Sequence, residues 1–502
     1  MTMKNYKLLA EKVIEKSLSK GADFSDVVVL GNISKNIGCR LGKVEEIEQS
    51  ETQILGLRTF IGKKNAITST NNFTESSIDS SIERVIEMTK LTPDDPLPGL
   101  ASKTSEKIPE LDLYDRTNLS AEELKNLALN AEESSLKTNG IKNSNGASVS
   151  QSKSSIYLAT SEGFSNGYEK SNFSLSCSVI AGSDKDMQTD YDYDSKVFYK
   201  DLKKASDIGK DAAKNTLLKC NPKKIQTCIS DIVFHPRVGR TLLGHFASLI
   251  NGSSIVRGSS FLKDKLNKKV FKAGINIIDN PNLIRGLKSK PFDDEGCSMD
   301  ILNLVEGGFL KKWILDTTTS KQLNLKSNCR ASRGISSPPI PSPTNLFIEN
   351  GNKSKEQLLS EVNDGFYVTD LIGQGVNLIT GDYSRGASGF KIENVFVLAG
   401  VPMIARAMFD ALSPELSVGP PIISRYIEAL LGEGELANQL EKIQNKFSDV
   451  DIGSYPFFRK GEIGLSVVAK GINSEAINNI INEVEKIIKS KNCKYCIDDE
   501  VI

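Results

Sequence analysis

The order of helical and strand-like segments over roughly the first 215 residues is the feature that most constrains the fold. Residues 1–24 place their apolar side chains at helical spacing between charges, which predicts an amphipathic helix. The apolar run at 26–30 predicts a buried strand. A further helix is predicted at 77–91, after the early strands. Another is predicted behind the capping-box residues Ser120 and Glu123. An order in which helices and strands form separate groups indicates an α+β domain, with helices at 77–91 and 121–138 and strands at 146–155, 155–161 and 173–182.

The sequence pattern changes at about residue 223. From there to 393, short strand signals are punctuated by Gly, Pro and Asn, and helix is predicted only around 237–251 and 355–363. This pattern predicts a strand-rich, barrel-like second domain. A third region begins at about 394 and returns to alternating strand and helix signals. We therefore expect an α+β protein with domains at 1–222, 223–393 and 394–502.

Charge and cysteine content exclude several classes of protein. Lys and Arg together number 63, as do Asp and Glu, so no bulk charge attracts nucleic acid or an anionic membrane. The amino terminus has no uninterrupted apolar run of the kind found in signal peptides, and no segment approaches the roughly 20 apolar residues of a bilayer crossing. The eight cysteines show no paired spacing. We expect a soluble, cytoplasmic protein with reduced thiols.

Three clusters of polar side chains are candidates for a metal or redox site. The acidic run at 293–295 could hold a hard cation, but a structural role with Arg285 or Lys290 is favoured. The acidic segment 188–194 lacks the Gly and terminal Glu of a calcium loop, so it is predicted to be a turn or a strand edge. The CxxC pair at 493–496 could be half a metal site or a redox pair, but two unlinked thiols are expected.

Two segments carry a resemblance to a known family. They are IVFHPRVGRTLLGHFASLINGSS at 232–254 and GDYSRGASGF at 381–390, with SSFLKDKL, RGLKSKPFDDEG and PPIPSPTNLFIENG between them. Together they resemble the TldD/PmbA family, and within it the PmbA (TldE) branch, over about residues 5–391. In the catalytic TldD branch a Leu-Leu pair precedes HExxH, in which two His bind zinc and the Glu acts as general base.

The zinc motif is absent after the corresponding Leu pair of this chain. By the resemblance, Gly244 and Leu249 are assigned to the two ligand positions and His245 to the base position. The resemblance therefore implies no catalytic residue, no metal ligand and no cofactor in this chain, with zinc supplied by a TldD-like partner. The only other histidine, His235, is too far from His245 along a helix to share one turn with it, so a metal site from this pair is not expected.

The resemblance also implies a function and a surface. It implies a heterodimer with a TldD-like subunit that cleaves peptides or unfolded proteins, in which this chain shapes the substrate path. Glycines let backbone approach a ligand or partner closely. The expected substrate or partner surface comprises His245, Gly373, Gly375, Asp382, Tyr383 and Arg385. The alternatives are an independent metallopeptidase with atypical ligands and, from the tail alone, a molybdopterin- or nucleotide-related protein.

The tail, residues 394–502, resembles a different family. VFVLAGVP, MIARAMFDAL, LGEGELANQLEKIQNKF and DVDIGSYPFF are similar to the back half of the CinA-type molybdopterin-binding domain. Strand and helix signals at 463–469 and 474–489 agree with an α/β architecture. The front half of that domain, with its Gly-rich phosphate-side loop, is absent. We expect a partial α/β segment, joined by gene fusion, that binds no pterin.

Overall fold

The computed structural model describes most of the chain on either side of residues 372–421. It describes 2–371 apart from 96, 98, 99, 102–107, 184, 185, 224, 225 and 227, and 422–498 apart from 460. Between these ranges it describes only 374–376, 379, 383–385, 390–392, 395–397, 406 and 409. The chain divides into two compact units, Met1–Ser388 and Gly389–Ile502.

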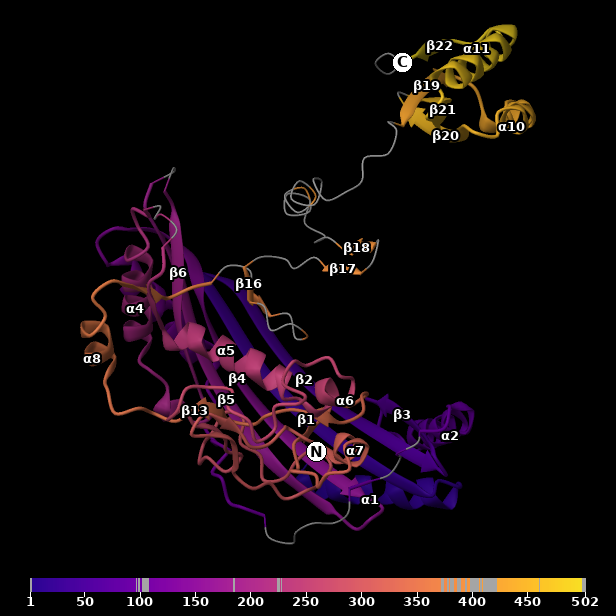
Figure 1. Ribbon diagram of the computed structural model, residues 1–502. Helices are drawn as coiled ribbons and strands as arrows, with labels where there is room; N and C mark the ends of the chain where they lie inside the picture. The colour runs from indigo at the N-terminus through magenta and orange to yellow at the C-terminus, as the bar shows by residue number, and fades with distance from the viewer. Residues whose placement is uncertain are drawn as a thin grey trace. The chain divides into compact units, whose positions relative to one another are not determined.

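A six-stranded sheet forms the centre of the first unit, with strand order β3-β2-β1-β4-β5-β6. Every neighbouring pair in it is antiparallel, and Figure 1 shows the long strands running side by side. Its strands are β1 (Phe24–Arg40), β2 (Lys43–Ile61), β3 (Lys64–Thr70), β4 (Ile141–Thr160), β5 (Ser165–Ala181) and β6 (Gln188–Lys196). The runs predicted at 146–155 and 155–161 are one strand, and 188–196 is the edge strand expected for the acidic segment.

Four helices pack against one face of this sheet. α1 (Met3–Ser19) and α2 (Glu75–Leu91) bury Val13 and Ile82 against Val27 and Leu57 of the strands. α3 (Ala121–Leu136) and α4 (Ala205–Leu217) form a second cluster against β4 and β5. Because successive strand side chains alternate between faces, Val28 points the other way. It packs with Phe292 of the second domain, so that domain covers the opposite face of the sheet.

The second domain mixes short strands and helices. Its sheets are open in the described residues, so the expected barrel-like closure is not found there. β7 (Asp231–Phe234) pairs in parallel with β14 (Gly365–Val368), and a four-stranded sheet has the order β10-β9-β8-β13. That sheet ends in two separate edges and does not close on itself. Its strands are β8 (Ile277–Asp279), β9 (Leu302–Glu306), β10 (Phe309–Leu310) and β13 (Leu346–Ile348). A separate pair is formed by β11 (Ala331–Ser332) and β12 (Ile340–Pro341). The helices are α5 (Pro236–Leu249), α6 (Gly252–Val256), α7 (Thr317–Gln322) and α8 (Lys355–Ser360), and a 3-10 turn, η1 (Tyr199–Asp201), precedes α4.

The described part of the second unit encloses a core of its own. Its sheet has the order β20-β21-β19-β22 and every pair in it is antiparallel. Ile480 and Val484 of α11 pack against Ile427 and Leu465 of the strands. The sequence predicts a partial domain here, and a partial domain would not be expected to enclose such a core. The elements are β19 (Ile423–Ala429), η3 (Glu433–Glu435), α10 (Ala437–Lys446), β20 (Asp451–Arg459), β21 (Glu462–Gly471), α11 (Ser474–Ser490) and β22 (Tyr495–Ile497).

Three further expectations can be compared with this architecture. The α+β fold class is confirmed, because helices and mostly antiparallel sheets pack as separate layers. All eight cysteines are free. Across the described ranges, no helix combines the length and the apolar composition of a membrane span.

Candidate functional site

Helix α5 occupies the position at which the resemblance locates the zinc helix. Its start is fixed by local chemistry: Pro236 is the first helical residue, and the backbone N–H of Arg237 donates to Nδ1 of His235 at 3.0 Å. The guanidinium of Arg237 then donates two hydrogen bonds, of 2.8 and 3.1 Å, to the buried carboxylate of Asp190 on β6. The helix is thereby anchored to the edge of the large sheet.

The ionisation of Asp190 and His235 follows from this anchor. Burial raises the pKa of Asp190, but hydrogen bonds from Arg237, the Tyr191 backbone and Lys219 outweigh burial, so its pKa lies below the usual value. Burial lowers the pKa of His235, and the nearby positive charge of Arg237 lowers it further. His235 is therefore a neutral cap at neutral pH, which leaves its Nδ1 free to accept the Arg237 N–H.

The helical spacing of α5 corrects one assignment of the two ligand positions. Two ligands on one helix face must be four residues apart, so a pair that starts at Gly244 ends at Ser248. The assignment of Leu249 was wrong by one residue, and Leu249 is buried in the core beside Phe246. The hydroxyl of Ser248 donates to the Gly244 carbonyl oxygen at 3.1 Å, within the helix. Neither Gly244 nor Ser248 offers an imidazole, so these positions do not fit zinc.

The predicted surface residues are only partly described. Gly373 and Asp382 lie outside the described residues, and His245 is half-buried in α5. Gly375 lies in β15 (Gln374–Val376), while Tyr383 and Arg385 lie in β16 (Tyr383–Arg385). These two strands pair antiparallel, so three of the predicted residues lie in one strand pair. Two more short strands, β17 (Phe390–Ile392) and β18 (Val395–Val397), form a second pair. The surface itself stays a prediction.

The acidic run after β8 has a structural role. Lys290 pairs with Asp294 at 2.8 Å, which confirms one expected partner, whereas Arg285 pairs with Asp112 and Asp201 instead. Asp293 is fully buried and accepts hydrogen bonds from three backbone N–H groups. Burial, and then the neighbouring Glu295, raise the pKa of Asp293 well above its usual value. Among the described residues, no three His, Cys, Asp or Glu side chains group as a metal site.

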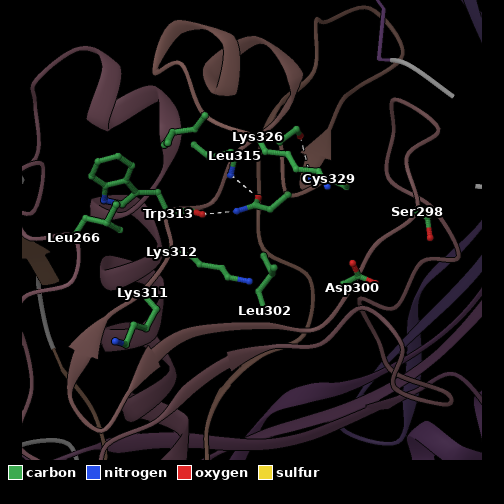
Figure 2. A pocket seen from close by; sticks show the side chains of 13 residues that line it. Leu266, Ser298, Asp300, Leu302, Lys311, Lys312, Trp313, Leu315, Lys326 and Cys329 are labelled. Carbon is green, nitrogen blue, oxygen red and sulfur yellow. Dashed lines mark hydrogen bonds between the residues drawn. The ribbon is translucent and has the colours of Figure 1, made fainter. Parts of the chain in front are cut away.

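A cavity of about 650 Å³ opens in the second domain, at a place that sequence reasoning missed. Figure 2 shows the side chains that surround it. Its frame is set by Asn328, whose Nδ2 donates to the Trp313 carbonyl at 2.7 Å while its Oδ1 accepts from the Leu315 N–H at 2.9 Å. The only available signal was the sequence Lys311-Lys312-Trp313, a cluster of two cations beside the only tryptophan. The lining residues are Leu266, Ser298, Asp300, Leu302, Lys311, Lys312, Trp313, Leu315, Leu325, Lys326, Ser327, Asn328 and Cys329.

Comparison with known proteins identifies the family. Residues 25–89, 114–219 and 227–413 match domain 1, the central domain and the C-terminal domain of the PmbA/TldA metallopeptidases. The chain is 33% identical to the "Metalloprotease PmbA homolog" of Haemophilus influenzae, over 82% of this chain and 90% of that protein. It is 32% identical to "Metalloprotease PmbA" of Escherichia coli O157:H7, over 76% and 85% respectively. The fold is thus that of a metallopeptidase-type α+β protein, and the chain belongs to the PmbA/TldD family.

Solved structures agree with this fold. A proposed modulator of DNA gyrase from Bacteroides thetaiotaomicron superposes with a TM-score of 0.70 at 25% identity, covering 76% of this chain and 85% of that one. TldE from Thermococcus kodakarensis shares the fold with a TM-score of 0.61 at 16% identity, covering 78% and 96%. The tail matches another family, since residues 421–495 match the middle domain of FAD synthase. The C-terminal PmbA/TldA match runs to residue 413, beyond the expected boundary at 393.

Proposed function

We propose that this chain is the zinc-free, PmbA (TldE)-type subunit of a cytoplasmic complex with a TldD-like protein that cleaves peptides or unfolded proteins. The observation that carries the proposal is the i, i+4 pair Gly244 and Ser248 on α5, where the catalytic branch needs two histidines. On this proposal the partner supplies the zinc and the general base, and this chain supplies no catalytic residue.

The way α5 is held supports a scaffolding role. One end is anchored through Arg237 and Asp190, and the other end buries Phe246 and Leu249 in the core of the second domain. The opposite stripe of the helix, Arg240, Gly244 and Ser248, is exposed. A helix that is fixed firmly but carries no ligands can still support a partner or shape a substrate path. We assign the same contact role to His245 and to Gly373, Gly375, Asp382, Tyr383 and Arg385.

Co-expression with the TldD-like protein of the same genome tests the proposal. We expect a complex with equal numbers of both chains by size analysis, peptide cleavage only in the complex, and zinc only with the partner. The positive control is the triple variant Gly244→His, His245→Glu, Ser248→His, which restores HExxH on an exposed stripe and should raise the zinc content of the isolated chain. About one tightly held zinc per unmodified chain, with chelator-sensitive cleavage, would instead favour an independent metallopeptidase.

A separate proposal concerns the tail. The match of residues 421–495 to a domain of FAD synthase keeps a nucleotide- or molybdopterin-related reading open. We propose that the segment was joined by gene fusion and binds no pterin. A chain that ends at residue 420 should then form the same complex and support the same cleavage. A loss of cleavage in the shortened chain, together with binding of FAD or a pterin by the full chain, would contradict this.

A further inference from the structure

The walls of the 650 Å³ cavity combine apolar surface with positive charge. Leu302 and Leu315 are buried at its base, and Trp313 and Leu325 extend the apolar lining. This volume falls within the range of cavities that bind small molecules or single side chains. An apolar cavity of this kind favours a ligand with a bulky hydrocarbon or aromatic group.

The charged groups at the same cavity favour an anion. Lys311, Lys312 and Lys326 line it, against the single carboxylate of Asp300. Figure 2 shows Lys312 extending across the cavity toward Leu302. Among the described residues, Lys312 and Lys326 take part in none of the ion pairs, and both side chains are exposed where they line the cavity. An amine without a carboxylate partner beside an apolar wall attracts a ligand anion more strongly than one in open water does.

We propose that this cavity binds the C-terminal residue of a peptide. The terminal carboxylate pairs with Lys312 and Lys326, and a large apolar side chain packs against Trp313, Leu302 and Leu315. The choice of a peptide as the source of the ligand rests on the proposed function. Because Asn328 ties the backbone of Trp313 to that of Leu315, the pocket is formed before the ligand arrives.

The chain contains its own reporter for this binding. Trp313 is the only tryptophan, so a change in intrinsic fluorescence on titration reports this cavity. The probe is an N-acetylated tetrapeptide ending in leucine, added to the isolated full-length chain. We expect a saturable change, at least tenfold weaker binding when the terminal carboxylate is amidated, and weaker binding when leucine is replaced by serine. Because the pairing is electrostatic and partly exposed, affinity should also fall as salt is raised.

Variants separate the charge from the fold. Lys312→Gln and Lys326→Gln should each weaken binding about three- to tenfold, and Lys312→Arg should restore it because the charge is kept. Lys263→Gln changes an exposed lysine of the same domain that does not line the cavity, and it should bind like the unmodified chain. These lysines are exposed, so their replacement leaves the core intact.

Three results would overturn the inference. They are no saturable fluorescence change with any peptide, equal affinity for the acid and the amide, and equal affinity for N-acetylleucine and the peptide. The last result would assign the cavity to small amphipathic carboxylates rather than to peptides. The titration needs no partner subunit, so failure of the heterodimer leaves its outcome unchanged. Conversely, if the complex cleaves peptides but the fluorescence of Trp313 does not change on titration, only this inference is contradicted and the proposed function stands.

Discussion

Arg333 of the second domain donates a hydrogen bond to Asp26 of β1, across 307 positions of the sequence. Asp26 also accepts from Arg58 of the neighbouring strand at 2.7 Å. Only 2% of the Asp26 and Arg333 side chains is exposed, so the group is removed from water. Burial raises the pKa of Asp26, but Arg333 and Arg58 outweigh that effect and the pKa is lowered. The second domain is thus joined to the centre of the sheet by a buried ionic contact.

Replacement of Asp26 should therefore be costly. Asp26→Ala leaves the guanidinium groups of Arg58 and Arg333 buried without a counter-charge, and the free energy of unfolding should fall by about 3–5 kcal/mol. Chemical denaturation of the isolated chain measures this. The control is Glu361→Ala, which breaks the exposed pair with Lys353 and should cost about 0–1 kcal/mol. Equal effects of the two variants would show that the buried contact adds little.

Two glycines in helices should respond to alanine with opposite signs. A Cβ on Gly209 of α4 would lie 2.0 Å from the Ala131 carbonyl oxygen of α3, so Gly209→Ala should destabilise the chain by about 1–3 kcal/mol. A Cβ on Gly244 of α5 meets nothing within 4 Å, so Gly244→Ala should stabilise it by about 0.5–1 kcal/mol through helix propensity. Thermal unfolding compares the two. Stabilisation by both variants would mean that α3 and α4 can separate at little cost.

Lys170 should make stability depend on pH. Burial, and then the charges of Lys290 and Lys288, lower its pKa from 10.5 to about 8. The folded state therefore disfavours the charged amine. The contribution of Lys170 to the unfolding free energy should fall as the pH is lowered from 10.5 to 8, and it should stay constant below pH 8. The unfolding free energy of the unmodified chain, minus that of the Lys170→Met variant, should rise by about 2 kcal/mol between pH 8 and pH 10.5. This value is smaller than the full effect of the pKa shift because Lys170 is partly exposed.

Urea denaturation of both chains at pH 8, 9 and 10.5 checks the Lys170 prediction. Other groups that titrate in this range are shared by the two chains and cancel in the difference. The variant Lys288→Met removes an exposed neighbour, so it should move the transition only slightly. Parallel pH profiles for the Lys170→Met variant and the unmodified chain would contradict the lowered pKa.

Residues 421–502 should fold without the rest of the chain. Ile480 is fully buried in the core of this unit, so Ile480→Ala should lower the unfolding free energy of the fragment by about 2–5 kcal/mol. In the full chain the same change should shift the unfolding of this unit and leave that of residues 1–388 in place. Calorimetry resolves the two transitions. A fragment without a cooperative transition would restore the view of the tail as an incomplete domain.

Local chemistry made part of the fold predictable. The Ser120 hydroxyl accepts from the Glu123 N–H at 3.2 Å and the Glu123 carboxylate accepts from the Ser120 N–H at 2.7 Å, so the expected capping box is present. The pair Lys290 and Asp294 is four residues apart and was foreseen for the same reason. The helix predicted around 237–251 is likewise present as α5, although the second ligand position was assigned one residue too far.

Contacts between distant segments were not predictable from the sequence. Nothing near Arg333 indicates that its partner is Asp26, and Arg285 bonds to Asp112 rather than to the acidic residues that follow it. The cavity beside Trp313 is lined by four segments, at 266, 298–302, 311–315 and 325–329, that only tertiary packing brings together. Periodicity and spacing describe neighbours along the chain. The contacts of Arg333 and Arg285 arise from the packing of the second domain on the first, and the cavity arises from packing within the second domain.

The order of strands in the large sheet also bears on how a newly made chain folds. β1 pairs with β2 through a tight turn, but its other edge pairs with β4, where Asp26 lies opposite Thr160. That edge has no partner until residues 141–160 have left the ribosome. An unpaired edge is a template for association with other chains, and pairing over such a separation slows folding. The nascent chain is therefore expected to be most prone to aggregation before β4 has emerged from the ribosome.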